Sequence, residues 1–220
     1  MPSSRPVPIP YVVDILRQIK PNAILDVGVG FGKYGHIFRE YTDIVAAEKD
    51  SKRYAREHWQ CRIEGVEVFE SYLTPMHSYL YNEIHIGEAS QVVANLSDQS
   101  YDLVWMGDVI EHLPKEEGLK LVRQLMRISR HCVVISTPSR FVEQSALMGN
   151  DHERHLSHWV AADFHSFGRV VSSDLPDEVR LVVISHPDRL LPKISLRHSP
   201  IKMQLYRWWR RFRGTDRAKS

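Results

Sequence analysis

A chain of 220 residues that is 43% hydrophobic and 25% charged can form one globular domain with a buried core, but it leaves no room for a second full domain. Its two cysteines are far apart, its polar N-terminus lacks the apolar segment of a signal peptide, and no stretch reaches the roughly 18 apolar residues of a membrane span, so we expect a cytoplasmic protein without disulfides. The net charge of +2 combines an acidic domain over residues 1–188, with 19 basic and 26 acidic residues, and a tail over residues 189–220, with ten basic residues and one acid.

The succession of helical and β-branched patterns predicts an α/β fold. A helical pattern begins at Pro10 and ends before Pro21, because proline is tolerated in the first turn of a helix but not in its interior. The predicted strands lie over residues 23–27, 66–69, 84–86, 101–106, 132–136, 169–171 and 179–185. Further helices are predicted over residues 33–40, 115–128 and 159–167. This order is typical of a seven-stranded, mostly parallel, doubly wound sheet with helices on both faces, in which the last two strands can form a hairpin.

A glycine-rich turn follows the first predicted strand and contains Asp26, Gly28, Gly30 and Gly32. Glycine lacks a Cβ and tolerates positive φ, so the backbone of such a turn can approach a ligand closely. A pyrophosphate-binding turn has the spacing G-x-G-x-x-G, whereas this one has G-x-G-x-G and is preceded by an acid that would repel pyrophosphate. The pattern suits a cofactor with a sulfonium and an ammonium group, and it resembles motif I of the class I S-adenosylmethionine-dependent methyltransferases.

A carboxylate at the end of the second strand would bind both ribose hydroxyls of such a cofactor. Glu48 lies 22 residues after Asp26, and Glu67 lies 41 residues after it. One helix and a turn must fit between this strand and the turn at Glu88, and the 21 residues from Glu67 suit that interval better than the 40 residues from Glu48. We therefore predict that Glu67 binds the ribose, that residues 42–62 are an insertion, and that Glu48 is the alternative.

The motifs together resemble the class I methyltransferase superfamily over residues 22–185. Besides the glycine-rich turn, they are Gly87-Glu88-Ala89, Tyr101-Asp102-Leu103-Val104, Asp108-Val109-Ile110-Glu111-His112-Leu113 and Ile135-Ser136-Thr137-Pro138. The resemblance implies that S-adenosyl-L-methionine is the cofactor, that Glu88 and Ala89 lie near its adenine, and that Asp108 contacts its methionine portion or supports the turn. Methyltransferases more often have Asp where this chain has Glu88.

The catalytic candidates follow the fourth predicted strand, at the edge where ligands bind in open α/β sheets. His112 is the best candidate to accept a proton from the methyl acceptor, because its pKa lies near neutrality. Glu111 and His155 are the other two candidates. Because methyl transfer is an in-line displacement, positioning alone can lower the barrier by up to roughly 7–11 kcal/mol, so a base is useful but not obligatory.

Two alternatives to metal-free methylation of a small molecule or glycan remain open. Glu111, His112 and His155, with Asp108 in place of a first acid, are similar to the metal ligands of small-RNA 3′-terminal 2′-O-methyltransferases, although Glu-His-Leu also occurs in metal-free methyltransferases. A metal-assisted RNA 2′-O-methyltransferase is therefore the first alternative, and a non-catalytic cofactor-binding subunit is the second. The leading prediction is O- or N-methylation of a small-molecule or glycan-type acceptor without a metal, because residues 149–164 resemble bacterial methyltransferases of unassigned substrate that are often linked to glycan pathways.

The basic tail combines arginines with an aromatic stripe. On a helix, Leu205, Trp208, Trp209 and Phe212 would fall at positions i, i+3, i+4 and i+7 and form one apolar face flanked by arginines. Such a helix suits contact with a membrane surface or an anionic polymer through residues 201–213. The alternative is that the stripe docks on the acidic domain.

Overall fold

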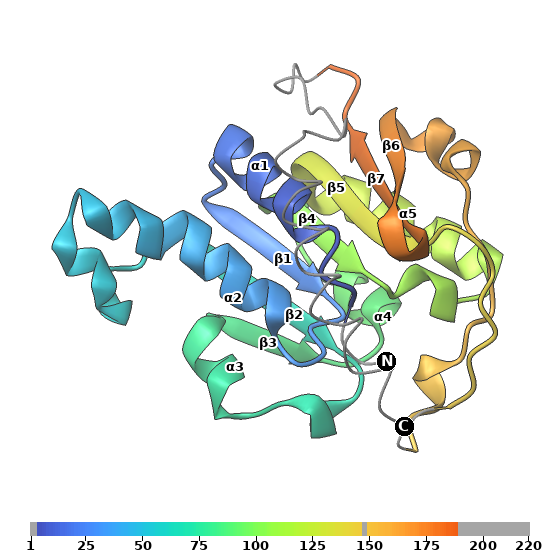
Figure 1. The fold of residues 1–220 in the computed structure, drawn as a ribbon, viewed down its shortest axis with the longest axis horizontal. Helices are drawn as coiled ribbons and strands as arrows, with labels where there is room; N and C mark the ends of the chain where they lie inside the picture. The colour runs from blue at the N-terminus through green and yellow to red at the C-terminus, as the bar shows by residue number, and fades with distance from the viewer. Residues whose placement is uncertain (1–3, 147–148, 189–220) are drawn as a thin grey trace, which may run out of the picture.

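The computed structural model describes residues 4–146 and 149–188, which form one seven-stranded sheet in the order β3-β2-β1-β4-β5-β7-β6 (Figure 1). The strands are β1 (Ala23–Val27), β2 (Arg62–Glu67), β3 (Glu83–Ile86), β4 (Tyr101–Gly107), β5 (Ser129–Pro138), β6 (Arg169–Leu175) and β7 (Val179–Ser185). The α-helices are α1 (Ile9–Ile19), α2 (Lys33–Arg39), α3 (Pro75–Leu80), α4 (Ala89–Ala94) and α5 (Lys115–Ile128). None of the α-helices within these residues is long and apolar enough to cross a membrane.

The sheet is mostly parallel, as the sequence predicts. Strands β1 to β5 pair with one another in parallel, whereas β7 is antiparallel to both β5 and β6. The predicted terminal hairpin is therefore confirmed. Because the strand order reverses between β1 and β4, the carboxyl ends of these two strands border a crevice, which is where open α/β sheets bind ligands.

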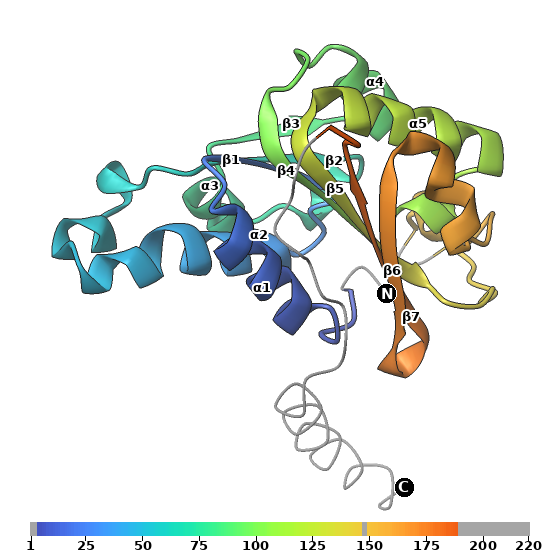
Figure 2. The same cartoon turned by 90° about the horizontal axis from the view of Figure 1, so that it is seen from above.

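Helices cover both faces of the sheet. Figure 2 shows α1 and α2 on one face and α4 and α5 on the other. The central strands are buried on both sides, so consecutive side chains of a strand enter different cores: Ile24 packs with α1, whereas Leu25 packs with α5. Because of this alternation, the Asp26 side chain lies on the same side of β1 as that of Ile24.

The second strand differs from its prediction. It begins at Arg62 and ends at Glu67, whereas the sequence predicts a strand over residues 66–69. Hydrophobic patterning does not predict the first half of this strand, because Arg62 and Glu64 are polar. In the structure these two side chains pair with each other, and Glu64 also accepts a hydrogen bond from Tyr101. Residues 40–58 form a series of short helical turns that continue α2 away from the sheet (Figure 1), so the segment predicted as an insertion over residues 42–62 is mostly helical turns and overlaps the first residue of β2.

Other differences lie mainly at element ends. The segment predicted as a helix over residues 159–167 is a 3-10 helix over Ala161–Phe167, and Trp159 precedes it as a fully buried side chain. Helices α3 and α4 carry no clear sequence signal, because each has only six residues. The tail over residues 189–220, including its predicted contacts through residues 201–213, lies outside the described residues.

Candidate functional site

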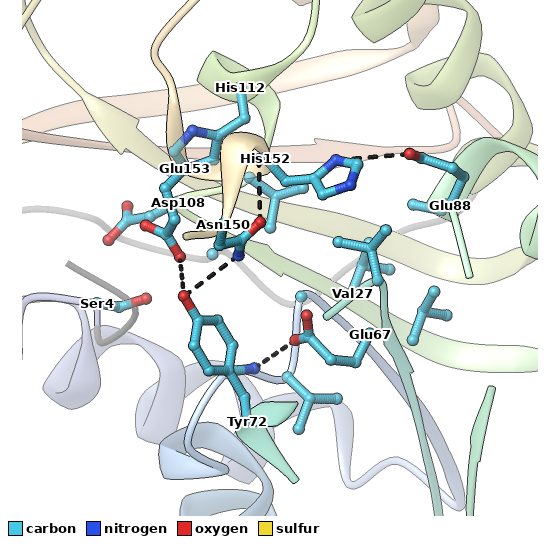
Figure 3. Close-up of a pocket in the computed structure, with 18 of the residues that line it drawn as sticks. Ser4, Val27, Glu67, Tyr72, Glu88, Asp108, His112, Asn150, His152 and Glu153 are labelled. Carbon is cyan, nitrogen blue, oxygen red and sulfur yellow. Dashed lines mark hydrogen bonds and ion pairs between the residues drawn. The ribbon is translucent and has the colours of Figure 1, made fainter. Parts of the chain in front are cut away.

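A cleft with about 1050 Å³ of space, its open mouth included, lies at the carboxyl ends of β1, β2, β3 and β4. The loops that follow these strands form its walls, and a segment after β5 closes one side (Figure 3). Its lining includes the predicted residues Gly28, Gly30, Glu67, Glu88, Ala89, Asp108 and His112. Because parallel strands end at one edge of a sheet, motifs that are far apart in sequence meet here.

The glycine-rich turn brings backbone atoms to the floor of the cleft. Gly28 has a φ of 79°, and a Cβ on it would lie 2.2 Å from Cγ2 of Val109. Gly30 also has positive φ, and its carbonyl oxygen is 3.0 Å from Nε2 of His77. Gly32 has a φ of 77° and caps α2, but it does not line the cleft. The first two glycines therefore form the surface of the turn that a ligand can reach.

Glu67 ends β2 beside this turn and is almost fully buried. Its Oε2 accepts a hydrogen bond of 2.8 Å from the Gly30 amide, and its Oε1 accepts one of 2.9 Å from the Phe69 amide. A carboxylate has about four lone-pair positions, so two remain after these bonds. The alternative ribose acid, Glu48, is exposed in the insertion and does not line the cleft.

Asp26 lies beneath the turn and does not line the cleft, although the sequence predicts that it contacts a cofactor. Its Oδ2 accepts a hydrogen bond of 2.5 Å from the Tyr81 hydroxyl, and its Oδ1 has no hydrogen-bond partner within the described residues. Burial raises the pKa of Asp26 to about 7, although the Tyr81 bond acts in the opposite direction. Asp26 thus ties the end of β1 to Tyr81 instead of lining the cleft.

The turn after β3 forms the far end of the cleft. Glu88 and Ala89 both line it, and Glu88 immediately precedes α4. The Glu88 side chain is partly exposed, and its Oε1 lies 3.5 Å from Nδ1 of His152, which reaches over from the segment after β5 (Figure 3). This contact joins two walls of the cleft across its mouth.

Asp108 directly follows β4 in a conformation that is uncommon for a residue with a side chain. Its φ is 53°, and its Oδ1 accepts a hydrogen bond of 2.9 Å from the Ser136 hydroxyl. The Asp108 amide donates to the Ser136 carbonyl oxygen at 2.9 Å. A non-glycine residue in this region of φ and ψ costs on the order of 1–3 kcal/mol, and such residues cluster at functional sites. The two hydrogen bonds with Ser136 hold the Asp108 carboxylate in the cleft wall despite this strain.

The structure brings the three catalytic candidates together, but only His112 lines the cleft. One potential ligand atom from each of Glu111, His112 and His155 lies within 4.8 Å of the others, and the two imidazole centroids are 4.9 Å apart. His112 Nδ1 is 3.0 Å from the Arg154 carbonyl oxygen, and His155 Nδ1 is 2.6 Å from the Val142 carbonyl oxygen. A carbonyl can only accept, so in each neutral ring Nδ1 carries the proton and Nε2 keeps its lone pair.

Burial governs protonation in this cluster. It raises the pKa of Glu111 well above its usual value, and the nearby charge of Asp108 raises it further. The Glu111 carboxyl group also accepts a hydrogen bond of 3.0 Å from Thr137. Burial lowers the pKa of His112, and the neighbouring His155 lowers it again. The cluster therefore favours a neutral His112 beside a carboxyl group that binds its proton tightly.

A second group of polar side chains, which comprises Tyr72, Asn150 and Glu153, faces the cleft from the other side of its opening. The Tyr72 hydroxyl donates to Glu153 Oε1 at 3.0 Å and accepts from Asn150 Nδ2 at 3.2 Å. All three side chains are buried and line the cleft. Asn150 and Glu153 belong to the motif over residues 149–164, whereas nothing in the sequence singles out Tyr72.

The segment that carries Asn150, Glu153 and His155 ends in the core. Trp159 is fully buried, and its indole N–H donates to the Ile110 carbonyl oxygen at 3.1 Å. The amides of Leu156 and Ser157 both donate to the Glu111 carbonyl oxygen, at 2.8 and 3.1 Å. This segment is therefore fixed to the turn after β4, which explains how His155 comes to lie beside His112.

No protein-family model and no curated protein sequence matches this chain. Many solved structures are similar to it in fold. One is the Burkholderia thailandensis 1,6-didemethyltoxoflavin-N1-methyltransferase with bound 1,6-didemethyltoxoflavin and S-adenosylhomocysteine, with a TM-score of 0.59, 14% identity, and coverage of 81% of this chain and 77% of that one. Another is a S-adenosylmethionine-dependent methyltransferase from Aquifex aeolicus, with a TM-score of 0.51, 17% identity, and coverage of 83% and 99%.

A putative O-methyltransferase from Nostoc punctiforme PCC 73102 is also similar, with a TM-score of 0.50 and 15% identity over 81% of this chain. The present chain spans 55% of the length of that protein. These likenesses and the strand order show that the chain has the class I S-adenosylmethionine-dependent methyltransferase fold.

Proposed function

We propose that this protein is an S-adenosylmethionine-dependent methyltransferase that methylates an oxygen or nitrogen atom of a small-molecule or glycan-type acceptor. The observation that carries the proposal is the position of Glu67, a buried carboxylate that ends β2, lines the cleft and bonds to the Gly30 amide of the glycine-rich turn. An acid at the end of β2 beside an open glycine turn provides what a ribose and an attached cationic chain require.

The residues present fit this cofactor. A Cβ on Gly28 would lie 2.2 Å from Cγ2 of Val109, so the turn has no room for a side chain at this position, and its backbone itself lines the cleft beside Glu67. In the proposal, Glu67 binds the ribose hydroxyls, Glu88 and Ala89 border the adenine, and Asp108 faces the methionine portion. When bound, the cofactor supplies an electrophilic methyl group. Asp26 contributes by tying the end of β1, which precedes the turn, to Tyr81.

His112 is the proposed proton acceptor. Its Nδ1–H bond to the Arg154 carbonyl oxygen fixes the ring and leaves the Nε2 lone pair available to an acceptor hydroxyl or ammonium proton. Glu111 and His155 hold the ring in place from the side away from the cleft. A positioned base accelerates proton transfer by roughly 10²- to 10⁴-fold, and the remaining catalysis comes from holding the acceptor in place.

Calorimetry with S-adenosylhomocysteine, together with transfer of labelled methyl groups from S-adenosylmethionine to pools of small-molecule and glycan acceptors, tests the proposal. His112→Asn should keep S-adenosylhomocysteine binding within about twofold while lowering turnover by about 100-fold or more. His58→Asn, an exposed histidine of the insertion, is the matched control and should change neither. Failure of the wild-type protein to bind S-adenosylhomocysteine would overturn the proposal, whereas binding without any methylated product would favour a non-catalytic subunit.

A metal-assisted methyltransferase acting on RNA 3′ ends is the second candidate function. It is favoured by the convergence of Glu111, His112 and His155, whose imidazoles are both held at Nδ1 by backbone carbonyls in the manner of metal-binding histidines. The leading proposal requires no metal and expects unchanged turnover in EDTA. Methylation of RNA 3′ ends that is lost in EDTA, recovers on adding Mn²⁺ or Co²⁺ and does not recover in His155→Ala would establish the second candidate in its place.

A further inference from the structure

Polar side chains line both ends of the cleft, but those at one end are partly exposed and those at the other end are buried. Figure 3 shows Glu88 at one end, Glu67 near the middle, and Tyr72, Asp108 and Glu153 toward the other end. The first end is a partly exposed turn, whereas the second is closed by the buried hydrogen-bond network of Tyr72, Asn150 and Glu153. Apart from Glu67, the most buried carboxylate that lines the cleft is therefore Glu153, at this second end.

The network fixes the direction of its hydrogen bonds. The Asn150 amide donates to the Tyr72 oxygen, and the Tyr72 hydroxyl donates its own proton to Glu153. The Tyr72 ring is held by two aromatic neighbours, with centroids 5.3 Å from Phe31 and 4.8 Å from Phe69. Glu153 Oε2 also accepts a hydrogen bond of 3.5 Å from Nε2 of Gln144, so both oxygens of this carboxylate are held in place. A carboxylate has about four lone-pair positions, and the negative charge of Glu153 can still attract a cation in the cleft.

The order of groups along the cofactor links this network to a function. If adenine lies at Glu88 and ribose at Glu67, as the proposed function states, the sulfonium and ammonium groups at the methionine end extend toward the opposite side of the cleft. We infer that Glu153, oriented by Tyr72 and Asn150, forms a subsite for this cationic end of the cofactor. Asp108, also on that side, adds a second carboxylate to the same wall.

The inference rests on the proposed function, and its test uses binding instead of turnover. The probes are sinefungin, which carries an ammonium in place of the methylated sulfur, S-adenosylhomocysteine, which keeps only the amino-acid ammonium, and 5′-methylthioadenosine, which has neither cation. Glu153→Gln preserves the shape of the side chain and removes its charge. Tyr72→Phe removes the orienting donor, and Glu143→Gln, an exposed acid of the same segment, is the matched control.

Glu153→Gln should weaken sinefungin binding about tenfold, equivalent to about 1.4 kcal/mol, while 5′-methylthioadenosine changes less than twofold. Tyr72→Phe should act in the same direction with a smaller effect, and Glu143→Gln should change nothing. S-adenosylhomocysteine identifies the cation: a loss equal to that of sinefungin assigns the ammonium, and an unchanged affinity assigns the sulfonium.

Equal losses for all three probes would overturn the inference, because Glu153 would then only maintain the shape of the cleft. Unchanged affinities for all three, with a raised KM for the methyl acceptor, would also overturn it and assign Glu153 to an acceptor amine or hydroxyl. Failure of the wild-type protein to bind any probe is a distinct result, since it would reject the proposed function and the inference together.

Discussion

Replacing Glu67 with glutamine keeps the size of the side chain but leaves one oxygen where two now accept hydrogen bonds. In the structure, those oxygens accept from the Gly30 amide at 2.8 Å and from the Phe69 amide at 2.9 Å. One of these amides would face the new NH₂ group of Glu67→Gln and lose a charged hydrogen bond, which contributes about 1.5–3 kcal/mol. The Gly30 bond shapes the cleft floor, and the negative charge that would attract ribose hydroxyls also disappears. We therefore expect S-adenosylhomocysteine to bind at least about tenfold more weakly to Glu67→Gln. Glu67→Ala should show a similar loss.

Calorimetry with S-adenosylhomocysteine measures this loss directly, and thermal unfolding of each variant separates weaker binding from loss of the fold. Glu48→Gln is the control, because Glu48 is exposed on the insertion and should leave both measurements unchanged. Wild-type affinity in Glu67→Gln would refute the reasoning. A loss confined to Glu48→Gln would show that the ribose acid lies in the insertion after all.

Three further predictions concern the turn, its support and the core. Gly28→Ala should reduce S-adenosylhomocysteine binding about tenfold or more by calorimetry, because the new Cβ would collide with Val109 at 2.2 Å in a backbone of positive φ; normal binding would contradict this. Burial raises the pKa of Asp26 from 3.8 to about 7, so the folded protein binds a proton here more tightly than the unfolded chain does. The unfolding free energy should therefore fall by roughly 1.4 kcal/mol per pH unit as pH rises between these values. Urea titrations at pH 5 and 7 should show this decline in the wild-type protein and a smaller decline in Asp26→Asn. Gly118→Ala would place a Cβ 2.4 Å from the Trp159 ring and should lower the unfolding free energy by about 1–2 kcal/mol, although alanine has the better helix propensity. A gain in stability by urea titration would contradict close packing of Trp159 against Gly118.

The fold follows from the sequence wherever a strand is mostly apolar. Strands β1 and β7 and helix α5 have the predicted bounds, because mostly apolar runs mark the two strands and an amphipathic pattern marks the helix. Strand β2 does not, because Arg62 and Glu64 read as loop residues until their mutual pairing and the bond from Tyr101 are known. These contacts join separate strands, and hydrophobic periodicity within one segment cannot reveal them.

The same distinction applies to the site. Gly28, Glu67 and His112 meet at the cleft because parallel strands deliver their following residues to one edge of the sheet, which the chain order already indicates. The sequence predicts Asp26 beside them, but strand alternation turns it toward Tyr81, on the face of the sheet that also holds Ile24. Tyr72 gave no signal, since its role depends on side chains about 80 residues away.

The burial of Trp159 affects how this protein could be re-engineered. In many α/β enzymes a loop over the site can be exchanged as a cassette, because its ends lie on the surface. Here the segment that carries Asn150 and Glu153 terminates in a core residue that fits against Gly118 of α5. A donor loop from another protein would have to bring a compatible α5 with it, so changes of ligand preference should arise more readily by single substitutions within the segment than by swapping it whole.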